Sequence, residues 1–144
     1  MRREDIGKYL GMIHRLHIML IDKKLESHDI THSHFFLLLS VYDNEGITQN
    51  DLCELYKIDK GAVSKGIKKL IEENLVVKLK DSEDKRKQLI YVTEKAKKIE
   101  KEIKGVLGLV EDDITKEISE EELDAFVDVI NKILNNLYAK VKER

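Results

Sequence analysis

"ITQNDLCELYKIDKGAVSKGIKKLIEEN", residues 47–74, contains the signals for two short helices joined by a tight connection. Thr48, with Asp51 three positions later, has the pattern of a capping box at the start of the first helix. Asp59 is suited to cap the second helix, because its side chain can accept a backbone N–H of the first turn. The chain is therefore expected to contain a pair of helices with a defined turn.

Each of these helices is expected to bury one side. The expected inward residues are Leu52, Leu55 and Tyr56 in the first helix and Val63, Ile67, Leu70 and Ile71 in the second. The opposite side of the second helix is small and basic, with Lys60, Ser64 and Lys68, and with Gly61 and Lys65 beside them. Such a surface fits the major groove of DNA, which is about 12 Å wide. The alternative is an ordinary helical hairpin with a solvated lysine face.

After residue 74 the apolar period changes from helical to strand-like. Residues 75–79 and 89–92 predict two strands around a highly charged loop. Strands this short are not a stable sheet alone, so the hairpin must pack on the helices. A hairpin beside a major-groove helix is a wing, and a guanidinium at its tip is attracted to the adjacent minor groove.

Helical periodicity predicts the remaining elements. Residues 4–25 form a first helix, and residues 31–44 form a second, capped by Thr31 or Ser33 and ended by Gly46 in a left-handed conformation. Residues 94–117 form a long helix with a bend near Gly105 and Gly108, and a capping box at residues 119–122 begins the last helix. The expected fold class is mainly α with a small β-hairpin wing.

Charge is unevenly distributed along the chain. Residues 57–104 hold 15 Lys and Arg against 9 Asp and Glu, whereas the whole chain has a net charge of −2. A basic segment in an otherwise acidic chain is typical of a nucleic-acid surface, although solvated lysine faces are common. No run of residues is apolar enough to cross a bilayer, and one cysteine agrees with a reducing compartment, so we expect a cytoplasmic protein without a membrane partner.

The helix pair, the wing and residues 30–46 together resemble the MarR family of winged helix-turn-helix transcription regulators, over residues 30–96. The wing pattern Asp81-x-x-Asp84-x-Arg86 is the most specific part. The resemblance implies that Arg86 contacts the minor groove, that Asp81 and Asp84 brace the wing, and that Lys85 and Lys87 contact phosphates. Lys57 departs from the pattern, because the family has Gly at this turn position, so either Lys57 is left-handed or the turn differs.

The resemblance also implies an organisation and an assembly. We expect a single domain, 1–144, with a DNA-binding lobe at 31–93 and helical dimerisation regions at 1–30 and 94–144. A homodimer would place two recognition helices in successive major grooves of a pseudo-palindromic double-stranded site, roughly 34 Å apart. The expected function is regulation of transcription, as a repressor released by a small molecule.

A small aromatic or phenolic effector is implied by the same resemblance, with Tyr9, His14, His17 and Phe35 as candidate contacts. Neither a metal nor another cofactor is expected, because the helix at residues 94–117, which supplies a histidine pair in the zinc-sensing relatives that the chain resembles, contains no histidine, and because Cys53 falls on an inward face. The sequence shows no nucleophile elbow or phosphate loop, which argues against an enzyme. The alternatives are a protein-interaction module that does not bind DNA and a metal- or redox-responsive regulator.

Overall fold

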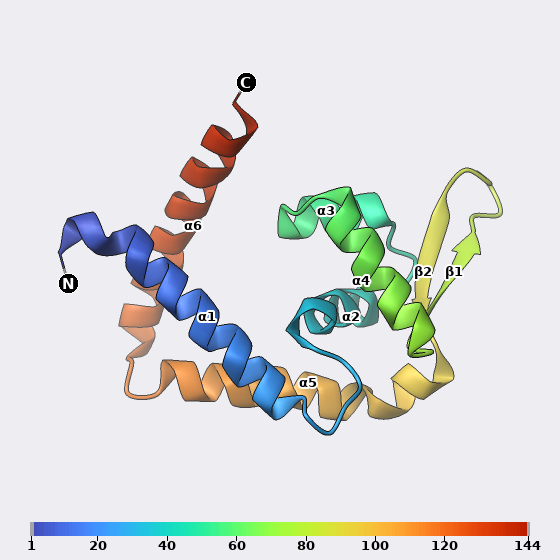
Figure 1. Cartoon of the computed structure of the whole chain (residues 1–144), viewed down its shortest axis with the longest axis horizontal. Coiled ribbons are helices and arrows are strands. Elements are labelled where there is room, and N and C mark those ends of the chain that lie inside the picture. Colours follow the sequence, from blue (N-terminus) through green and yellow to red (C-terminus); the bar gives the residue numbers. More distant parts are fainter. Residues whose placement is uncertain (1, 144) are drawn as a thin grey trace. The chain divides into compact units, whose positions relative to one another are not determined.

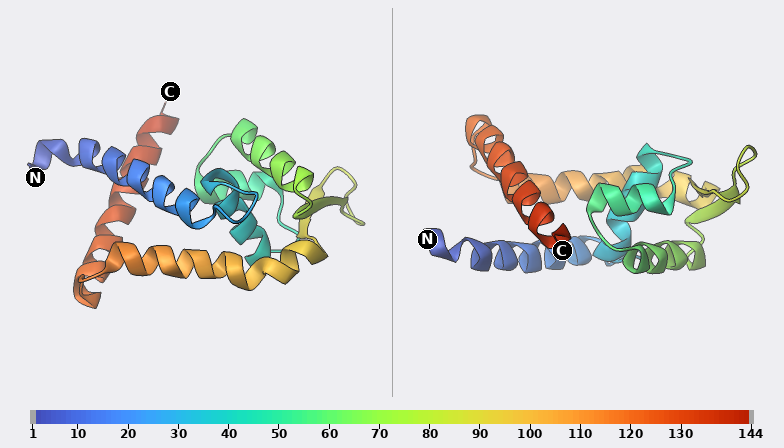
Figure 2. Two further views of the ribbon diagram at one scale, coloured as in Figure 1. Left: turned by 60° about the horizontal axis from the view of Figure 1, so that its bottom comes forward. Right: turned by 90° about the horizontal axis from the view of Figure 1, so that it is seen from above.

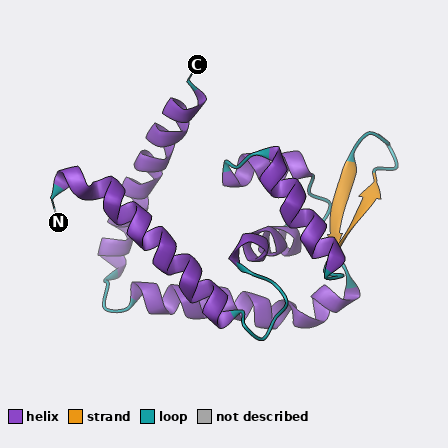
Figure 3. Ribbon diagram, viewed as in Figure 1, coloured by secondary structure: helices purple, strands orange, loops and turns teal. Residues whose placement is uncertain are grey.

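The computed structural model describes residues 2–143; Met1 and Arg144, the ends of the expected single-domain range, lie outside the described residues. A short 3-10 turn, Arg3–Asp5, precedes α1 (Ile6–Lys24), α2 (His32–Asp43), α3 (Gln49–Tyr56) and α4 (Lys60–Glu72) (Figure 1). The strands β1 (Val76–Lys80) and β2 (Gln88–Val92) follow, then α5 (Glu94–Thr115) and α6 (Glu120–Lys142). The expected fold class, mainly α with a β-hairpin, is confirmed (Figure 3).

Capping fixes the start of α3 and of α4 as predicted. The Asp51 N–H donates to Thr48 Oγ1 and the Thr48 N–H donates to Asp51 Oδ2, each at 3.1 Å. The Ala62 N–H donates to Asp59 Oδ1 at 2.8 Å and so caps α4. Between the helices, Lys57 is the C-cap of α3 and has φ +54°, the first of the two alternatives considered for it. A left-handed conformation costs a residue with a Cβ about 1 kcal/mol, which the surrounding caps offset.

The core lies where α2 packs against α4 and β2. Helix α2 is buried on most of its sides, as its apolar sequence predicted. Large side chains that are fully buried in this core include Phe35, Leu38, Leu52, Ile67, Leu70 and Ile90. The two strands are antiparallel with Val76 opposite Val92, and these two residues face the core. The hairpin is therefore held by the helices, while its loop projects away from them (Figures 1 and 2).

Two residues predicted to face inward are exposed. Leu55 is 58% exposed. The inward side of α3 is formed by Leu52 together with the partly buried Cys53 and Tyr56, so Leu55 lies at its edge. Ile71 is 41% exposed. The buried side of α4 includes Gly66, so the centre of that side lies away from Ile71. Helical periodicity located both apolar faces but not their edges.

The prediction that Gly46 ends the second helix as its left-handed cap was also wrong. Asn44, not Gly46, is the C-cap of α2 and has φ −142°. Gly46 does have a positive φ of +89°, yet its N–H donates to the carbonyl of Ile90 at 2.8 Å. The Ile90 N–H in turn donates to the Ile47 carbonyl at 2.9 Å. The left-handed glycine thus connects the chain after α2 to the wing instead of closing the helix.

The C-terminal third forms two helices. Helix α5 continues across Gly105 and Gly108 and buries Ala96, Ile103, Val106 and Val110. Contacts divide the chain after Val110 into two compact units, so the last part of α5 and all of α6 form the second. The predicted capping box of Ser119 and Glu122 begins α6, and no residue of α6 is buried. Within the described residues no helix is long and apolar enough to span a membrane.

Close approach of α4 to α2 depends on Gly66. A Cβ at this position would lie 2.4 Å from Leu37 Cδ1, and Leu37 is itself 3% exposed. The absence of a side chain lets α4 approach α2 more closely than any other residue would allow.

Gly66→Ala is therefore expected to destabilise the protein by up to about 2 kcal/mol, since overpacking costs about 1–3 kcal/mol and the gain in helix propensity offsets about 1 kcal/mol of it. Gly105→Ala is the matched control, because nothing lies within 4 Å of its added Cβ. That control is expected to raise stability. Urea unfolding at one protein concentration measures both, and equal effects of the two substitutions would contradict the packing argument.

Candidate nucleic-acid interface

The outer side of α4 carries the predicted DNA-contacting residues. Val63, Ile67 and Leu70 are buried and fix the rotation of the helix about its axis. All five predicted residues, Lys60, Gly61, Ser64, Lys65 and Lys68, are exposed. The buried apolar residues thus hold a small, basic surface toward solvent.

The wing loop is shaped by its two predicted acidic residues. Asp81 Oδ1 accepts the N–H of Glu83 at 3.0 Å. Asp84 Oδ1 accepts both the backbone N–H and the side-chain Nε–H of Arg86, each at 3.1 Å, and Asp84 Oδ2 lies 3.4 Å from Arg86 Nη2. The Lys87 N–H donates to the Asp84 carbonyl and the Asp81 N–H donates to the Lys87 carbonyl, each at 3.0 Å. The guanidinium is therefore oriented while the Arg86 side chain stays 92% exposed.

This bonding changes the acidity of Asp84. The side-chain hydrogen bond from Arg86 and then its backbone N–H hold the pKa of the Asp84 carboxyl below its ordinary value, with a smaller contribution from the charge of Lys87. A lowered folded-state pKa means that the brace is intact at neutral pH and is lost as pH falls through that lowered value. Lys85 and Lys87, beside Arg86 in the loop, are exposed.

A polar groove, which the sequence did not predict, adjoins the wing loop. It has a volume of about 530 Å³ and is lined by residues 48–51, at the start of α3, and residues 85–88, at the wing tip. The only sequence signal for it is the run of polar residues that follows the Thr48 cap. The chain folds these two segments together because β2 is bonded to the loop before α3.

A second cavity contains two of the four candidate effector residues. His14 and His17 line a space of about 340 Å³, together with residues of α1 and α2, Tyr56 and Ile58. Tyr9 is outside this lining, and Phe35 is fully buried in the core while its neighbour Phe36 lines the space. Periodicity alone could not separate these two adjacent aromatic residues.

Tyr56 and His17 are the notable polar groups of this cavity. The Tyr56 hydroxyl donates to the Phe36 carbonyl at 2.7 Å, and burial is the main cause that raises the pKa of Tyr56. His17 packs against Phe36 with ring centroids 6.2 Å apart. Its Nε2 atom is buried without a hydrogen-bond partner among the described residues. An unsatisfied buried nitrogen is costly unless a ligand or water binds it.

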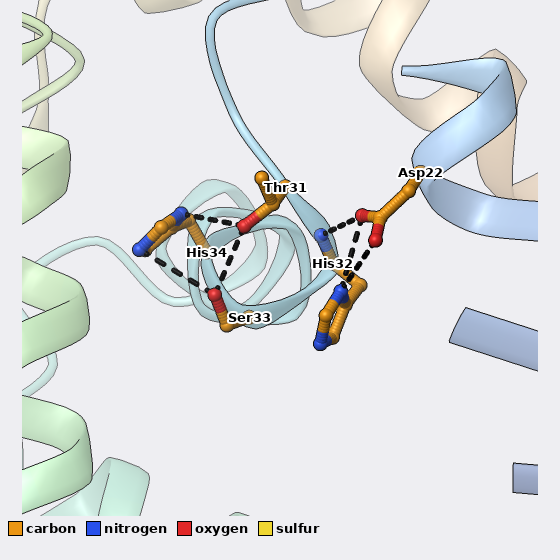
Figure 4. A network of polar contacts seen from close by, with 5 residues as sticks. All are labelled: Asp22, Thr31, His32, Ser33 and His34. Atoms are coloured by element: carbon orange, nitrogen blue, oxygen red, sulfur yellow. Dashed lines mark hydrogen bonds and ion pairs between the residues drawn. The ribbon is translucent and has the colours of Figure 1, made fainter. Parts of the chain in front are cut away.

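A carboxylate of α1 caps α2 in place of the predicted Thr31 or Ser33 side chain (Figure 4). Thr31 is the N-cap by position, yet its Oγ1 contacts Ser33 at 3.0 Å and His34 Nδ1 at 3.2 Å. The His32 N–H instead donates to Asp22 Oδ1 at 2.7 Å, and His32 Nδ1 lies 2.9 Å from Asp22 Oδ2. This contact joins α1 to α2. Its two residues are ten positions apart in the sequence, so no local sequence pattern predicts it.

His34, on α2, interacts electrostatically with Lys69 and Lys65 of α4. Partial burial, and after it the charge of Lys69 on α4, lowers the pKa of His34. The lowered pKa means that the fold disfavours the charged imidazolium beside the lysines of α4.

A metal- or redox-responsive regulator would need a cluster of metal ligands or a reactive thiol. Among residues 2–143 no cluster of three or more His, Cys, Asp or Glu side chains is arranged to hold a metal ion. Cys53 is half-buried and packs against the core.

The fold and its exposed basic surfaces define a winged helix-turn-helix protein. The family model described as "MarR family" matches residues 28–87. The chain is thus similar to the MarR family over these residues, in agreement with the resemblance found in its sequence.

Two curated relatives are HTH-type transcriptional regulators and not enzymes. YybA of Bacillus subtilis (strain 168) is 33% identical over 95 residues, which cover 66% of this chain and 63% of that protein. This chain thus spans less than two thirds of that relative. SarZ of Staphylococcus haemolyticus (strain JCSC1435) is 27% identical over 112 residues, which cover 78% of this chain and 75% of SarZ.

Two solved structures have a similar fold over nearly the whole of this chain. The transcriptional regulator SlyA is 26% identical with a TM-score of 0.88, covering 94% of this chain and 96% of SlyA. A MarR family regulator from Listeria monocytogenes, solved in complex with 26mer DNA, is 25% identical with a TM-score of 0.87, covering 100% of this chain and 98% of that one.

Arg86→Ala is expected to return the pKa of Asp84 toward the ordinary value of an aspartate, since two hydrogen bonds to the carboxylate are lost with the side chain. Carboxyl ¹³C NMR titration measures this shift. Lys85→Ala is the control, because it leaves both bonds from Arg86 in place. A pKa for Asp84 that is the same in wild type and Arg86→Ala would show that Arg86 is not held by Asp84.

Proposed function

We propose that this chain is a sequence-specific DNA-binding transcription regulator that acts as a homodimer, represses its target genes and is released from DNA by a small molecule. The observation that carries the proposal is the pairing of an exposed basic face on α4 with a braced, exposed arginine on the adjoining wing. The Listeria relative solved with DNA supports it.

Helix α4 enters the major groove with its small and basic side. Gly61 and Ser64 allow close approach, and Lys60, Lys65 and Lys68 contact phosphates or guanine edges. Arg86 enters the adjacent minor groove, and Lys85 and Lys87 contact the flanking phosphates. The wing brace orients the guanidinium before binding, which reduces the entropy lost on contact.

Exposed apolar side chains on α1 and α6 support the homodimer. Helix α1 exposes Ile13, Leu16 and Met19, of which Met19 is 67% exposed. Helix α6 is amphipathic, and its exposed apolar residues include Phe126, Leu134, Leu137 and Val141. A second copy of the chain buries these residues and places two recognition helices on one pseudo-palindromic site. Regions 1–30 and 94–144 serve as dimerisation regions, and 31–93 as the DNA-binding lobe.

The small molecule binds in the cavity lined by His14 and His17. Apolar side chains suit a small aromatic or phenolic compound, and the unsatisfied Nε2 of His17 suits a polar substituent on it. Such a ligand releases DNA only if it prefers a dimer geometry that DNA disfavours. We place this regulator in the cytoplasm.

A protein-interaction module without DNA binding is the alternative function. It would have no use for a basic face on α4 or for an arginine aligned by a carboxylate. A metal- or redox-responsive regulator is the other alternative, and neither Cys53 nor the histidines of the described residues offer a site that favours it.

Arg86→Ala is expected to weaken binding to a selected duplex by about 1–3 kcal/mol, because a groove contact is lost. Dimerisation should be unchanged. Fluorescence anisotropy measures the affinity, and Arg3→Ala, which removes an arginine outside the helix-turn-helix and wing, is the matched control. Equal affinities of Arg86→Ala and Arg3→Ala would rule out the role of the wing.

Leu137→Glu is expected to shift the protein from dimer to monomer in sedimentation velocity, because it places a charge in the apolar face of α6. Asn135→Glu, on the opposite side of the same helix, should remain a dimer. Far-UV circular dichroism separates dissociation from unfolding. A folded Leu137→Glu dimer with wild-type affinity would exclude α6 from the interface.

A further inference from the structure

The side of the wing that faces away from the core is apolar. Alternation along the strands turns Val76, Ile90 and Val92 to the buried side. The other side of the hairpin is formed by Val77, Leu79, Leu89 and Tyr91. Val77 is 38% exposed and Leu79 is 54% exposed. A hairpin that packs one face on a core is expected to be polar on the other, so packing on the helices does not account for this apolar face.

Strand β1 also has a free backbone edge. The far edge of β2 is occupied, because the Ile90 N–H donates to the Ile47 carbonyl and the Ile90 carbonyl accepts the N–H of Gly46. Ile90 therefore directs its backbone groups away from β1. Lys78 lies opposite Ile90 in a pair without hydrogen bonds, so its own N–H and C=O point outward from the hairpin. The same holds for Lys80, two positions along the strand.

The bonds at the two ends of the hairpin agree with this alternation. The Thr93 N–H donates to the Leu75 carbonyl and the Asp81 N–H donates to the Lys87 carbonyl, each at 3.0 Å. Odd-numbered positions of the first strand thus form the ladder, and the even-numbered ones do not. Outside the hairpin, no backbone hydrogen bond of residues 2–143 uses the outward groups at positions 78 and 80. These groups are available to another strand.

The free edge is basic. Lys78 and Lys80 project on the same side of β1 as Val76, opposite to Val77 and Leu79. Neither lysine has an ion-pair partner among the described residues. Lysines on an edge strand disfavour pairing with a neutral or basic strand. Carboxylates placed opposite them are favoured, because opposite charges across two strands stabilise a sheet.

A second copy of β1 does not suit this edge. Antiparallel pairing centred on Lys78 places that lysine opposite its own counterpart, and pairing centred on Leu79 places Lys78 opposite Lys80. Like charges directly opposite each other destabilise a pair of strands. The edge therefore selects against self-association and in favour of an acidic partner.

We propose that the outer edge of β1 binds an acidic, extended segment of another protein as an additional strand of the wing. Main-chain hydrogen bonds to Lys78 and Lys80 supply affinity. Carboxylates of the incoming strand lie opposite these two lysines, and its alternate side chains, which are apolar, lie beside Val77 and Leu79. The recognised segment thus alternates acidic and apolar residues along the five residues of β1.

A bound acidic strand has a consequence for DNA. It lies beside the wing loop that follows Lys80 and holds Arg86. Its negative charge repels phosphates there, so the segment and a duplex weaken each other's affinity by the same factor. Binding of the segment alone is measured without DNA, so failure of the proposed DNA-binding function would leave that result standing.

Backbone amide NMR of the full-length protein tests the site. The probe is a short synthetic peptide in which glutamate and valine alternate, and its control is a peptide in which lysine and valine alternate. The glutamate peptide alone is expected to cause saturable shifts and slower hydrogen exchange at the amides of Lys78 and Lys80.

Three outcomes would overturn the proposal. The first is no saturable change, and the second is a change of equal size with the lysine peptide or one centred on α4 instead of β1. The third is a shift of the Lys78 and Lys80 amides when the protein concentration alone is raised, which would assign the edge to a second copy of the chain.

Two substitutions of Lys80 separate the charge from the backbone bond. Lys80→Gln removes the charge and is expected to lower peptide affinity about threefold. Lys80→Pro also removes the outward N–H but no bond of the hairpin, so a loss of about tenfold is expected. Lys98→Gln, at an exposed position on α5, is the matched control and should bind as the wild type does.

Nuclear Overhauser contacts between Val77 and Tyr91, which lie opposite each other, check that the hairpin is intact in each variant. Equal peptide affinities of Lys80→Gln and Lys80→Pro with an intact hairpin would refute strand addition at β1.

Discussion

The packing of α4 on α2 is the contact on which the rest of the winged helix-turn-helix depends. Gly66 lets the two helices approach until Leu37 fills the space that a side chain would occupy. Val63, Ile67 and Leu70 then bury the same side of α4. With its rotation fixed in this way, the helix must present lysines, glycine and serine to solvent. The chemistry of the exposed face follows from the geometry of the buried one.

The wing is placed by bonds to the same lobe. Backbone hydrogen bonds join Ile90 to Gly46 and Ile47, and the Val92 N–H donates to Glu45 Oε1 at 3.1 Å. At the other end, the Thr93 hydroxyl donates to the Asn74 carbonyl at 2.7 Å. The wing and α4 are thus both fixed to one core.

Local chemistry made much of this fold predictable. Caps need only a side chain and an N–H three residues away, so Thr48, Asp59 and Ser119 were assigned correctly. The strand pattern likewise located both arms of the wing. Features set by tertiary packing were less accessible. Leu55 and Ile71 sit at the edges of their apolar faces, where burial depends on the neighbouring helix and not on the period.

The candidate site shows the same division. The exposed residues of α4 and the wing follow from periodicity and from a short motif, which is why their placement agrees with the sequence. The Asp22–His32 contact, the lining of the cavity beside His17 and the groove beside Asn50 each join segments that are distant along the chain. No single-sequence pattern encodes which of two adjacent aromatic residues, Phe35 or Phe36, turns toward a cavity.

Hydroxyl-radical footprinting of the full-length protein on a duplex enriched from a random pool tests the central claim most directly. A dimer that uses α4 and the wing of each copy predicts two protected regions related by two-fold symmetry, with recognition-helix contacts about 34 Å apart and protection extending into the flanking minor grooves. A single unsymmetrical protected region, or no protection at low salt after removal of bound small molecules, would contradict the claim.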